Sequence, residues 1–443
     1  MNIQLSEHFT LKKLLRFTLP SIVMMIFTSV YGVVDGFFVS NFVGKTPFAA
    51  VNFIMPFLMI LGAVGFMFGT GGSALIAKTM GEGDSHKANR LFSLFVYTTV
   101  VCGIVIGIVG IILIRPLAVL LGAEGEMLEY CVTYGRVILI ALPFYMLQYE
   151  FQSYFAAAEK PQLGLAVTIA SGLTNMILDA LFMAIFHWGV VGAAAATAVS
   201  QAVGGTVPLI YFSRRNKSKL RLTKTKWDGK ALLKACTNGS SELMSNISMS
   251  VVSMLYNVQL MKYAGENGVA AYGVLMYVNM IFLAAFIGYS VGTAPVTGYH
   301  YGAGNYSELK SLLKKSACVI SIFAVCMFLL AEILAHPLAK VFVGYDETLL
   351  NLTQHGFMIF SFSFLFAGFS IYGSSFFTAL NNGLISALIS FLRTLVFQIA
   401  AVLILPAFLE IDGIWISIVV AEIMAVMITI FFVVKMRKKY HYI

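Results

Sequence analysis

The sequence predicts an all-α polytopic membrane protein in which twelve transmembrane helices form two parallel six-helix lobes related by an axis along the membrane normal. Three observations lead to this fold class. The chain is 59% hydrophobic and only 11% charged. Apolar stretches long enough to cross a bilayer recur along it, and its second half repeats the residue pattern of its first half. A chain with so apolar a composition is expected to fold in a lipid bilayer and not in water.

The repeat is visible in the positions of glycine. At least five glycines have a second glycine 221 residues later, and 221 is half of the 443-residue chain. Chance would align roughly two pairs at any one offset. The first members of these pairs include Gly71, Gly81, Gly83, Gly135 and Gly192. A constant offset over so many positions indicates that one unit occurs twice.

Each half contains six apolar stretches of the length that a membrane-crossing helix needs, about 20 residues. In the first half they lie near 14–40, 48–77, 91–114, 127–156, 162–186 and 189–212, and in the second near 235–262, 268–298, 312–335, 353–379, 384–408 and 414–434. Because six is an even number, both copies enter the membrane from the same side and are parallel. We therefore expect an amino-terminal lobe at 1–212, a basic cytoplasmic linker at 213–234 and a carboxy-terminal lobe at 235–443, facing a central cleft.

The formal charge of +9 is interpreted as a topology signal. Lys and Arg collect at both termini, in the linker and in the loops after the second and eighth stretches, whereas the opposite loops favour acids such as Glu126 and Asp346. Since cytoplasmic loops carry the excess of basic residues, both termini are expected in the cytoplasm of a cell-membrane protein. The expected partners are the bilayer and small molecules, without nucleic acid, and the chain is expected to be a monomer.

The sequence lacks the residue patterns that several other classes of function require. Gly44-Lys45-Thr46 supplies only the end of a phosphate-binding loop, whose first glycine would fall at Val39. The glycine-rich run 69–73 lies inside an apolar stretch, where small residues let helices approach closely. The five cysteines have no metal-ligand spacing, and the histidines are too scattered for a catalytic cluster. We expect no enzyme activity and no cofactor, and energy from an ion gradient.

Asp35 and Asp179 are the main candidates for function. Each lies well inside an apolar stretch, where an ionised carboxylate costs several kcal/mol, so such acids are functional hypotheses by default. Tyr31 lies four residues before Asp35 and Asn175 four before Asp179, so each pair shares a helix face. Together with the Thr197 hydroxyl, the two acids and the Asn175 amide would form an oxygen-only site that could load and release H+ or Na+. The structural alternative is that Asp35 caps a broken helix and that Asn175 joins helices.

This polar cluster belongs to the first half alone. At the 221-residue offset, Asn175, Asp179 and Thr197 correspond to apolar residues, which are Val396, Ala400 and Ile418. The shared pattern explains the scaffold, so the unshared cluster is the better candidate for the function. Pro20, fifteen residues before Asp35, is either a tolerated early-turn proline or a bend that responds to the charge of Asp35.

Two stretches resemble the multidrug and toxic compound extrusion (MATE) family, and the resemblance covers essentially the whole chain. They are Pro20 to Gly36, with Tyr31-Gly-Val-Val-Asp35-Gly, and Pro295-Val-Thr-Gly-Tyr-His-Tyr-Gly-Ala303. The chain is most similar to the prokaryotic DinF-like and MepA-like exporters. The resemblance implies that the family's first-lobe cation site corresponds to Asp35, Asn175, Asp179 and Thr197, with Tyr31 and Tyr134 as nearby tyrosines.

The second lobe departs from the family pattern. Some branches carry an acid in the middle of the seventh helix and another in the tenth, but 353–378 has none here, and Glu242 lies early in its helix. A coupling site in this lobe is therefore disfavoured. Arg393 and Glu422 lie at comparable depths on neighbouring helices, so we interpret them as a structural ion pair, with contact to substrate as the alternative.

The resemblance implies a cation-coupled antiporter that exports bulky, often cationic or aromatic compounds by alternating access. The 22 Met and 37 Phe would suit such substrates, although they also fill any membrane core. The alternative is a flippase for lipids or lipid-linked oligosaccharides, or a narrow-substrate metabolite exporter, on the same fold. A phosphate-bearing substrate would call for a more cationic cleft than Arg393 alone supplies.

Overall fold

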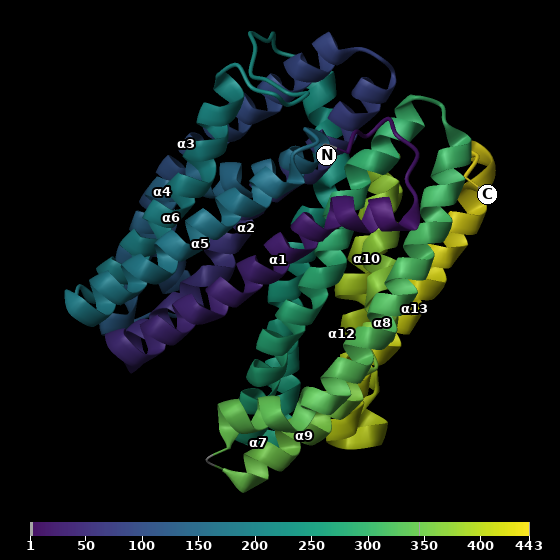
Figure 1. The fold of residues 1–443 in the computed structure, drawn as a ribbon. Helices are drawn as coiled ribbons and strands as arrows, with labels where there is room; N and C mark the ends of the chain where they lie inside the picture. The colour runs from purple at the N-terminus through teal and green to yellow at the C-terminus, as the bar shows by residue number, and fades with distance from the viewer. Residues whose placement is uncertain (1–2, 345, 443) are drawn as a thin grey trace.

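The computed structural model describes residues 3–344 and 346–442, and the secondary structure in these ranges is helical (Figure 1). The first half contains α1 (Leu11–Phe38), η1 (Val39–Val43), α2 (Lys45–Gly81), α3 (Ser85–Leu120), α4 (Gly125–Ala157), α5 (Pro161–Asp179), η2 (Ala180–Ile185) and α6 (Gly189–Ser213). The second half contains α7 (Gly229–Gly302), α8 (Tyr306–Val343), α9 (Glu347–Ser361), α10 (Phe364–Ala379), α11 (Gly383–Phe391), η3 (Leu392–Val396), α12 (Phe397–Ile404) and α13 (Pro406–Tyr440).

These helices make twelve membrane crossings within the described ranges. The 74-residue α7 is two spans that meet at Gly265, whose φ of 62° and ψ of −153° break the helix. A pair of shorter helices, α9 and α10, bend by 50° within one span. The π-helical segments η1, η2 and η3 continue the helices before them, and α13 is broken at Glu410. The predicted fold class, twelve spans in two lobes, is confirmed.

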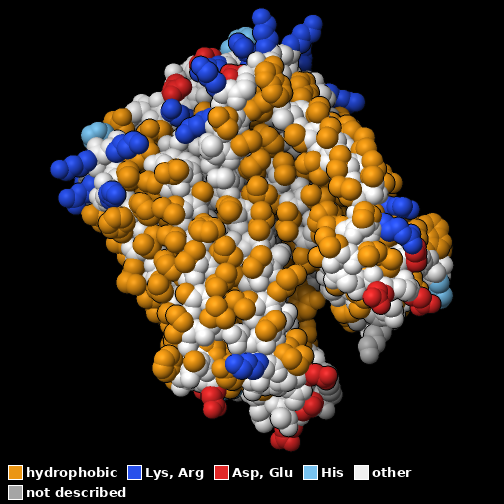
Figure 2. Space-filling view, turned by 180° about the vertical axis from the view of Figure 1, so that it is seen from behind, with side chains coloured by type: hydrophobic (Ala, Val, Ile, Leu, Met, Phe, Trp, Pro, Cys, Tyr) orange, Lys and Arg blue, Asp and Glu red, His pale blue; other side chains and the backbone are white. Residues whose placement is uncertain are grey.

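The two lobes touch at one end of the molecule and diverge at the other (Figure 1). Helices α1 to α6 form one lobe, and α7 to α13 form the other. Both termini lie at the end where the lobes meet. Most Lys and Arg side chains also gather there, a broad apolar band follows, and acids gather at the far end, where the surface is hollowed between the lobes (Figure 2). We call these the basic end and the acidic end.

Glycines related by the repeat form the contact at the basic end. A Cβ on Gly81 would lie 1.9 Å from the carbonyl oxygen of Tyr299, and one on Gly302 would lie 2.0 Å from that of Lys78. The two glycines are 221 residues apart, and each packs against the helix that carries the other. Farther inside, a Cβ on Gly71 would meet the Ala235 carbonyl oxygen at 2.0 Å. The interpretation of the glycine-rich run as a packing surface is confirmed.

The chain between α6 and α7 lies along the first lobe. The backbone N–H of Arg221 donates to Asn89 at 2.6 Å, and that of Thr223 donates to Ser93 at 2.8 Å, both on α3. The first helix of the second half begins at Gly229, before the expected boundary at 235, because the Asp228 side chain caps it by accepting from the Ala231 N–H.

Replacing Gly302 by valine is expected to destabilise the contact at the basic end, because the new side chain would meet backbone atoms of α2 that cannot move alone. Overpacking of this kind costs about 1–3 kcal/mol. The measurement is the midpoint of thermal unfolding of the purified protein in detergent. Gly273→Val in the same helix is the matched control, since nothing lies within 4 Å of a Cβ there. An equal loss in both variants would contradict this role of Gly302.

Candidate functional site in the first lobe

The structure brings the four predicted cation-site residues together from three helices. The carboxylate of Asp35 on α1 lies beside the side chains of Asn175 and Asp179 on α5. Tyr134 on α4 lies next to Thr197 on α6 and near both acids. Asn175 and Asp179 are 2% and 0% exposed. Asp35 and Thr197 are half-buried, so the cluster lies inside the first lobe and is enclosed most fully at α5.

Several polar atoms of this cluster have no hydrogen-bond partner among the described residues. They are one carboxylate oxygen of Asp35, both carboxylate oxygens of Asp179, the amide nitrogen of Asn175 and the hydroxyl of Thr197. A buried polar atom without a partner costs about 1–3 kcal/mol, and more when it carries charge. Native proteins leave few such atoms, so their concentration here indicates a site for a further ligand.

The donor set fits a proton or a small hard cation. Two carboxylates and a hydroxyl offer oxygen atoms, the ligand type that hard cations prefer. In the described ranges no group of three or more His, Cys, Asp or Glu side chains could hold a metal ion. With two acids and neutral neighbours, the cluster suits an exchangeable monovalent ion better than a tightly held divalent metal.

The backbone is irregular beside both acids. The α-helix α5 ends at Asp179, and the π-helical η2 starts at the next residue. In α1, the N–H of Val39 reaches the carbonyl oxygens of Asp35 and Gly36, and η1 starts there. π-helical segments are rare and occur frequently at functional sites. Gly172 lets α1 and α5 approach, because a Cβ there would lie 2.5 Å from Phe27 and 2.9 Å from Tyr31.

Tyr31 connects the acids to a second polar group that the sequence did not reveal. Its side chain lies beside Asp35 and beside Gln148 of α4. Gln148 lies 3.3 Å from the hydroxyl of Ser171, which donates to the Ser200 carbonyl oxygen at 2.7 Å. Glutamine and serine are common at helix contacts in membranes, so no residue pattern singles these out.

Glu150 on α4 is a buried acid that the sequence analysis did not single out. It is 0% exposed, and neither of its carboxylate oxygens has a hydrogen-bond partner in the described ranges. Its neighbours are Thr99 and Tyr154 rather than the Asp35 cluster. Its position within the apolar stretch 127–156 was the available signal.

Pro20 is the tenth residue of α1 and is buried. It lies more than two turns inside the helix, so the early-turn interpretation is wrong for this position. A proline there removes one backbone hydrogen bond and clashes with the carbonyl four residues before it, which weakens the helix locally. The position of Pro20 inside α1 agrees with the alternative interpretation, in which the proline marks a place where the helix can bend.

The second lobe contains a separate charged cluster. The Arg393 Nε donates to both carboxylate oxygens of Glu422, at 3.0 and 2.9 Å, and its Nη2 lies 2.8 Å from one of them. The two side chains are 14% and 4% exposed. Glu242 on α7 lies close enough to Arg393 for an electrostatic interaction between their side chains. The structure thus joins all three predicted charges into one group with a formal charge of −1.

The family model MatE matches residues 20–181 and 243–404, two segments of equal length in the two halves of the chain. The chain belongs to the MatE family. The two matched segments agree with the repeat seen in the glycine positions. Since the members of this family are transporters, the expectation that the chain is a transporter and not an enzyme is confirmed.

Individual relatives and structures agree with this assignment. A Staphylococcus haemolyticus protein named multidrug export protein MepA is 27% identical over 365 residues, covering 81% of this chain and 80% of its own length. An outward-facing structure of a multidrug resistance MATE family transporter has a TM-score of 0.93 and 22% identity, and the match covers 98% of both chains. A Pyrococcus furiosus transporter described as having a binding pocket of reverse polarity has a TM-score of 0.89 and 23% identity, covering 96% of this chain and 95% of its own.

Replacing Glu422 by glutamine is expected to lower stability by about 3–5 kcal/mol, because it leaves the buried Arg393 guanidinium without its charged partner. The double variant Glu422→Gln with Arg393→Met removes both charges and should recover most of that loss. The measurement is the thermal unfolding midpoint in detergent.

The matched control is Glu129→Gln, which breaks an exposed pair with Arg115 whose side chains are 50% and 60% exposed. Such a pair contributes about 0–1 kcal/mol, so little change is expected. A double variant as unstable as Glu422→Gln would contradict a structural role for the buried pair.

Proposed function

We propose that this protein is a cation-coupled antiporter that exports bulky, cationic or aromatic compounds across the cell membrane. The observation that carries the proposal is the group of buried, unpartnered polar atoms at Asp35, Asn175, Asp179 and Thr197. The group lies in one lobe only, although the scaffold is duplicated. H+ or Na+ bound there would neutralise carboxylates that are otherwise costly to bury.

In this proposal the lobes at 1–212 and 235–443 move against each other, and the linker at 213–234 joins them on the cytoplasmic side. The hollow between the lobes at the acidic end is the outward-open cleft (Figure 2). The basic end is the cytoplasmic end, in agreement with the distribution of Lys and Arg. The protein acts as a monomer, with its cleft between the lobes of one chain.

Exchange requires that ion and substrate disfavour each other. An ion at Asp35 and Asp179 removes negative charge that attracts a cationic substrate, so loading the ion from outside releases the substrate. Tyr31 and Tyr134 position the acids, and Pro20 allows α1 to bend as the charge of Asp35 changes. A membrane potential of 100 mV contributes about 2.3 kcal/mol for each net charge that moves inward.

The charges of the second lobe favour this function over a flippase. A lipid phosphate needs cationic partners, and the only cation in the Glu242, Arg393 and Glu422 group is held by two hydrogen bonds to a carboxylate. The remaining negative charge suits a cationic compound. A relative named as a multidrug export protein supports the same substrate class.

Ethidium efflux from drug-sensitive cells tests this proposal. Cells expressing the wild-type chain should export ethidium, and Asp179→Asn should abolish export because the fixed neutral amide cannot exchange an ion. Collapsing the proton and sodium gradients separately identifies the coupling ion, since only one collapse should stop export. Glu126→Gln, at an exposed acid in the first turn of α4, is the matched control and should leave export unchanged. Export by Asp179→Asn at the wild-type rate would contradict the proposal.

A further inference from the structure

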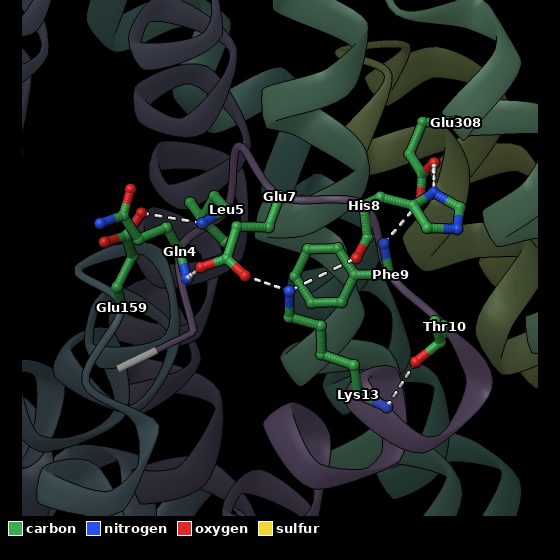
Figure 3. Close-up of polar contacts among 9 residues, drawn as sticks. All are labelled: Gln4, Leu5, Glu7, His8, Phe9, Thr10, Lys13, Glu159 and Glu308. Carbon is green, nitrogen blue, oxygen red and sulfur yellow. Dashed lines mark hydrogen bonds and ion pairs between the residues drawn. The ribbon is translucent and has the colours of Figure 1, made fainter. Parts of the chain in front are cut away.

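The segment before α1 crosses from one lobe to the other at the basic end (Figure 3). Residues 3–10 contain no helix, yet Leu5 and Phe9 are both 0% exposed. The segment is therefore packed into the protein and is not a loose terminus. Its polar contacts reach Glu159 in the first lobe and Glu308 in the second (Figure 3).

The first-lobe anchor is the turn between α4 and α5. The backbone N–H of Leu5 donates to the carboxylate of Glu159 at 2.8 Å. Glu159 adopts a left-handed conformation with φ of 60°, which places its side chain at the end of α4. Burial raises the pKa of the Glu159 carboxyl above its usual value. A buried acceptor of this kind depends on the donor that the segment provides.

The second-lobe anchor is Glu308, in the first turn of α8. One of its carboxylate oxygens accepts from the Phe9 N–H at 3.0 Å, and the other lies 2.6 Å from Nδ1 of His8. Lys315, also on α8, donates to the Phe9 carbonyl oxygen. The Phe9 ring packs edge-on to His300 of α7 at 6.4 Å between ring centroids. Each of these partners belongs to the second lobe.

The length of chain between the anchors limits how far the lobes can separate. Leu5 and Phe9 are four residues apart, and four residues span at most about 14 Å when fully extended. Opening the basic end to a bulky compound would separate the lobes by about the diameter of a helix, about 10 Å. Residues 5–9 already bridge the gap in the closed state, so a movement of that size must stretch this short segment or release one of the anchors.

We propose that residues 3–10 form a strap that holds the two lobes together at the basic end and must detach from one lobe before that end opens. The strap supplements the glycine contacts between α2 and α7, which close the same end. It also joins this end to α1, the helix that carries Asp35. The inference rests on the alternating access of the proposed function, but it does not depend on the identity of the ion or the substrate.

The test is the distance between the basic ends of the lobes, measured by double electron–electron resonance in lipid nanodiscs without substrate. Spin labels replace Lys87 on α3 and Lys438 on α13, which are both exposed, in the full chain with its five cysteines replaced. Glu308→Ala removes the second-lobe anchor, and Glu159→Ala removes the first-lobe anchor. Each should raise the population at the longer distance about tenfold, the effect of losing hydrogen bonds to a charged group.

The matched control is Glu7→Gln, because among the described residues the Glu7 carboxylate forms its hydrogen bonds with Gln4 and Lys13, within the same segment and the start of α1 (Figure 3). It should leave the distance distribution unchanged. Thermal unfolding of each labelled variant checks that it is folded. His8→Ala is a milder second-lobe variant, since the His8 side chain is 67% exposed, and it should also raise the population at the longer distance. A shift in only one of the two anchor variants, no shift in either, or an equal shift in Glu7→Gln would overturn the proposal.

Discussion

The bilayer requires each polar group inside it to find its partner within the protein, and the rest of this structure depends on that constraint. Helices satisfy the backbone, so the chain folds as twelve spans. Side chains are satisfied pairwise, as in the Arg393 and Glu422 ion pair. Around Asp35 and Asp179, several buried polar atoms from three helices lie together without protein partners among the described residues. A duplicated scaffold that gathers two acids, an amide and a hydroxyl without partners in one copy is arranged for an exchangeable ligand.

At the closed basic end, glycines related by the repeat form the contact between the two lobes. Gly81 and Gly302 occupy equivalent places in the two copies and pack reciprocally, so the same helix contact occurs twice about the pseudo-symmetry axis. Glycine contacts bring backbones close without directional bonds, which suits surfaces that must separate and meet again. The strap adds directional hydrogen bonds at the rim of this contact, where His8 and Phe9 meet Glu308. The contact thus combines a flat apolar surface with polar contacts at its edge.

The fold and much of the candidate site could be predicted from the sequence because both leave periodic or compositional signals. Glycine spacing revealed the repeat, and acids within apolar stretches stood out at Asp35 and Asp179. Tertiary contacts without such a signal could not be predicted. Gln148 and Ser171 are ordinary helix-contact residues, and nothing in the sequence placed Glu242 beside Arg393. Pro20 was placed near a helix start because an apolar stretch does not show where a polar first turn begins.

In the proposed mechanism, ion and substrate compete through the Asp35 and Asp179 group. The most direct measurement is ion release when a lipophilic cation, tetraphenylphosphonium, is added to the purified protein in weakly buffered detergent. Proton release is followed with a pH indicator, and sodium release with radioactive sodium bound beforehand. If ion and substrate compete, the wild-type chain releases one of the two ions on binding the cation, and Asp179→Asn releases neither. Binding of the cation without ion release by the wild-type chain would contradict it.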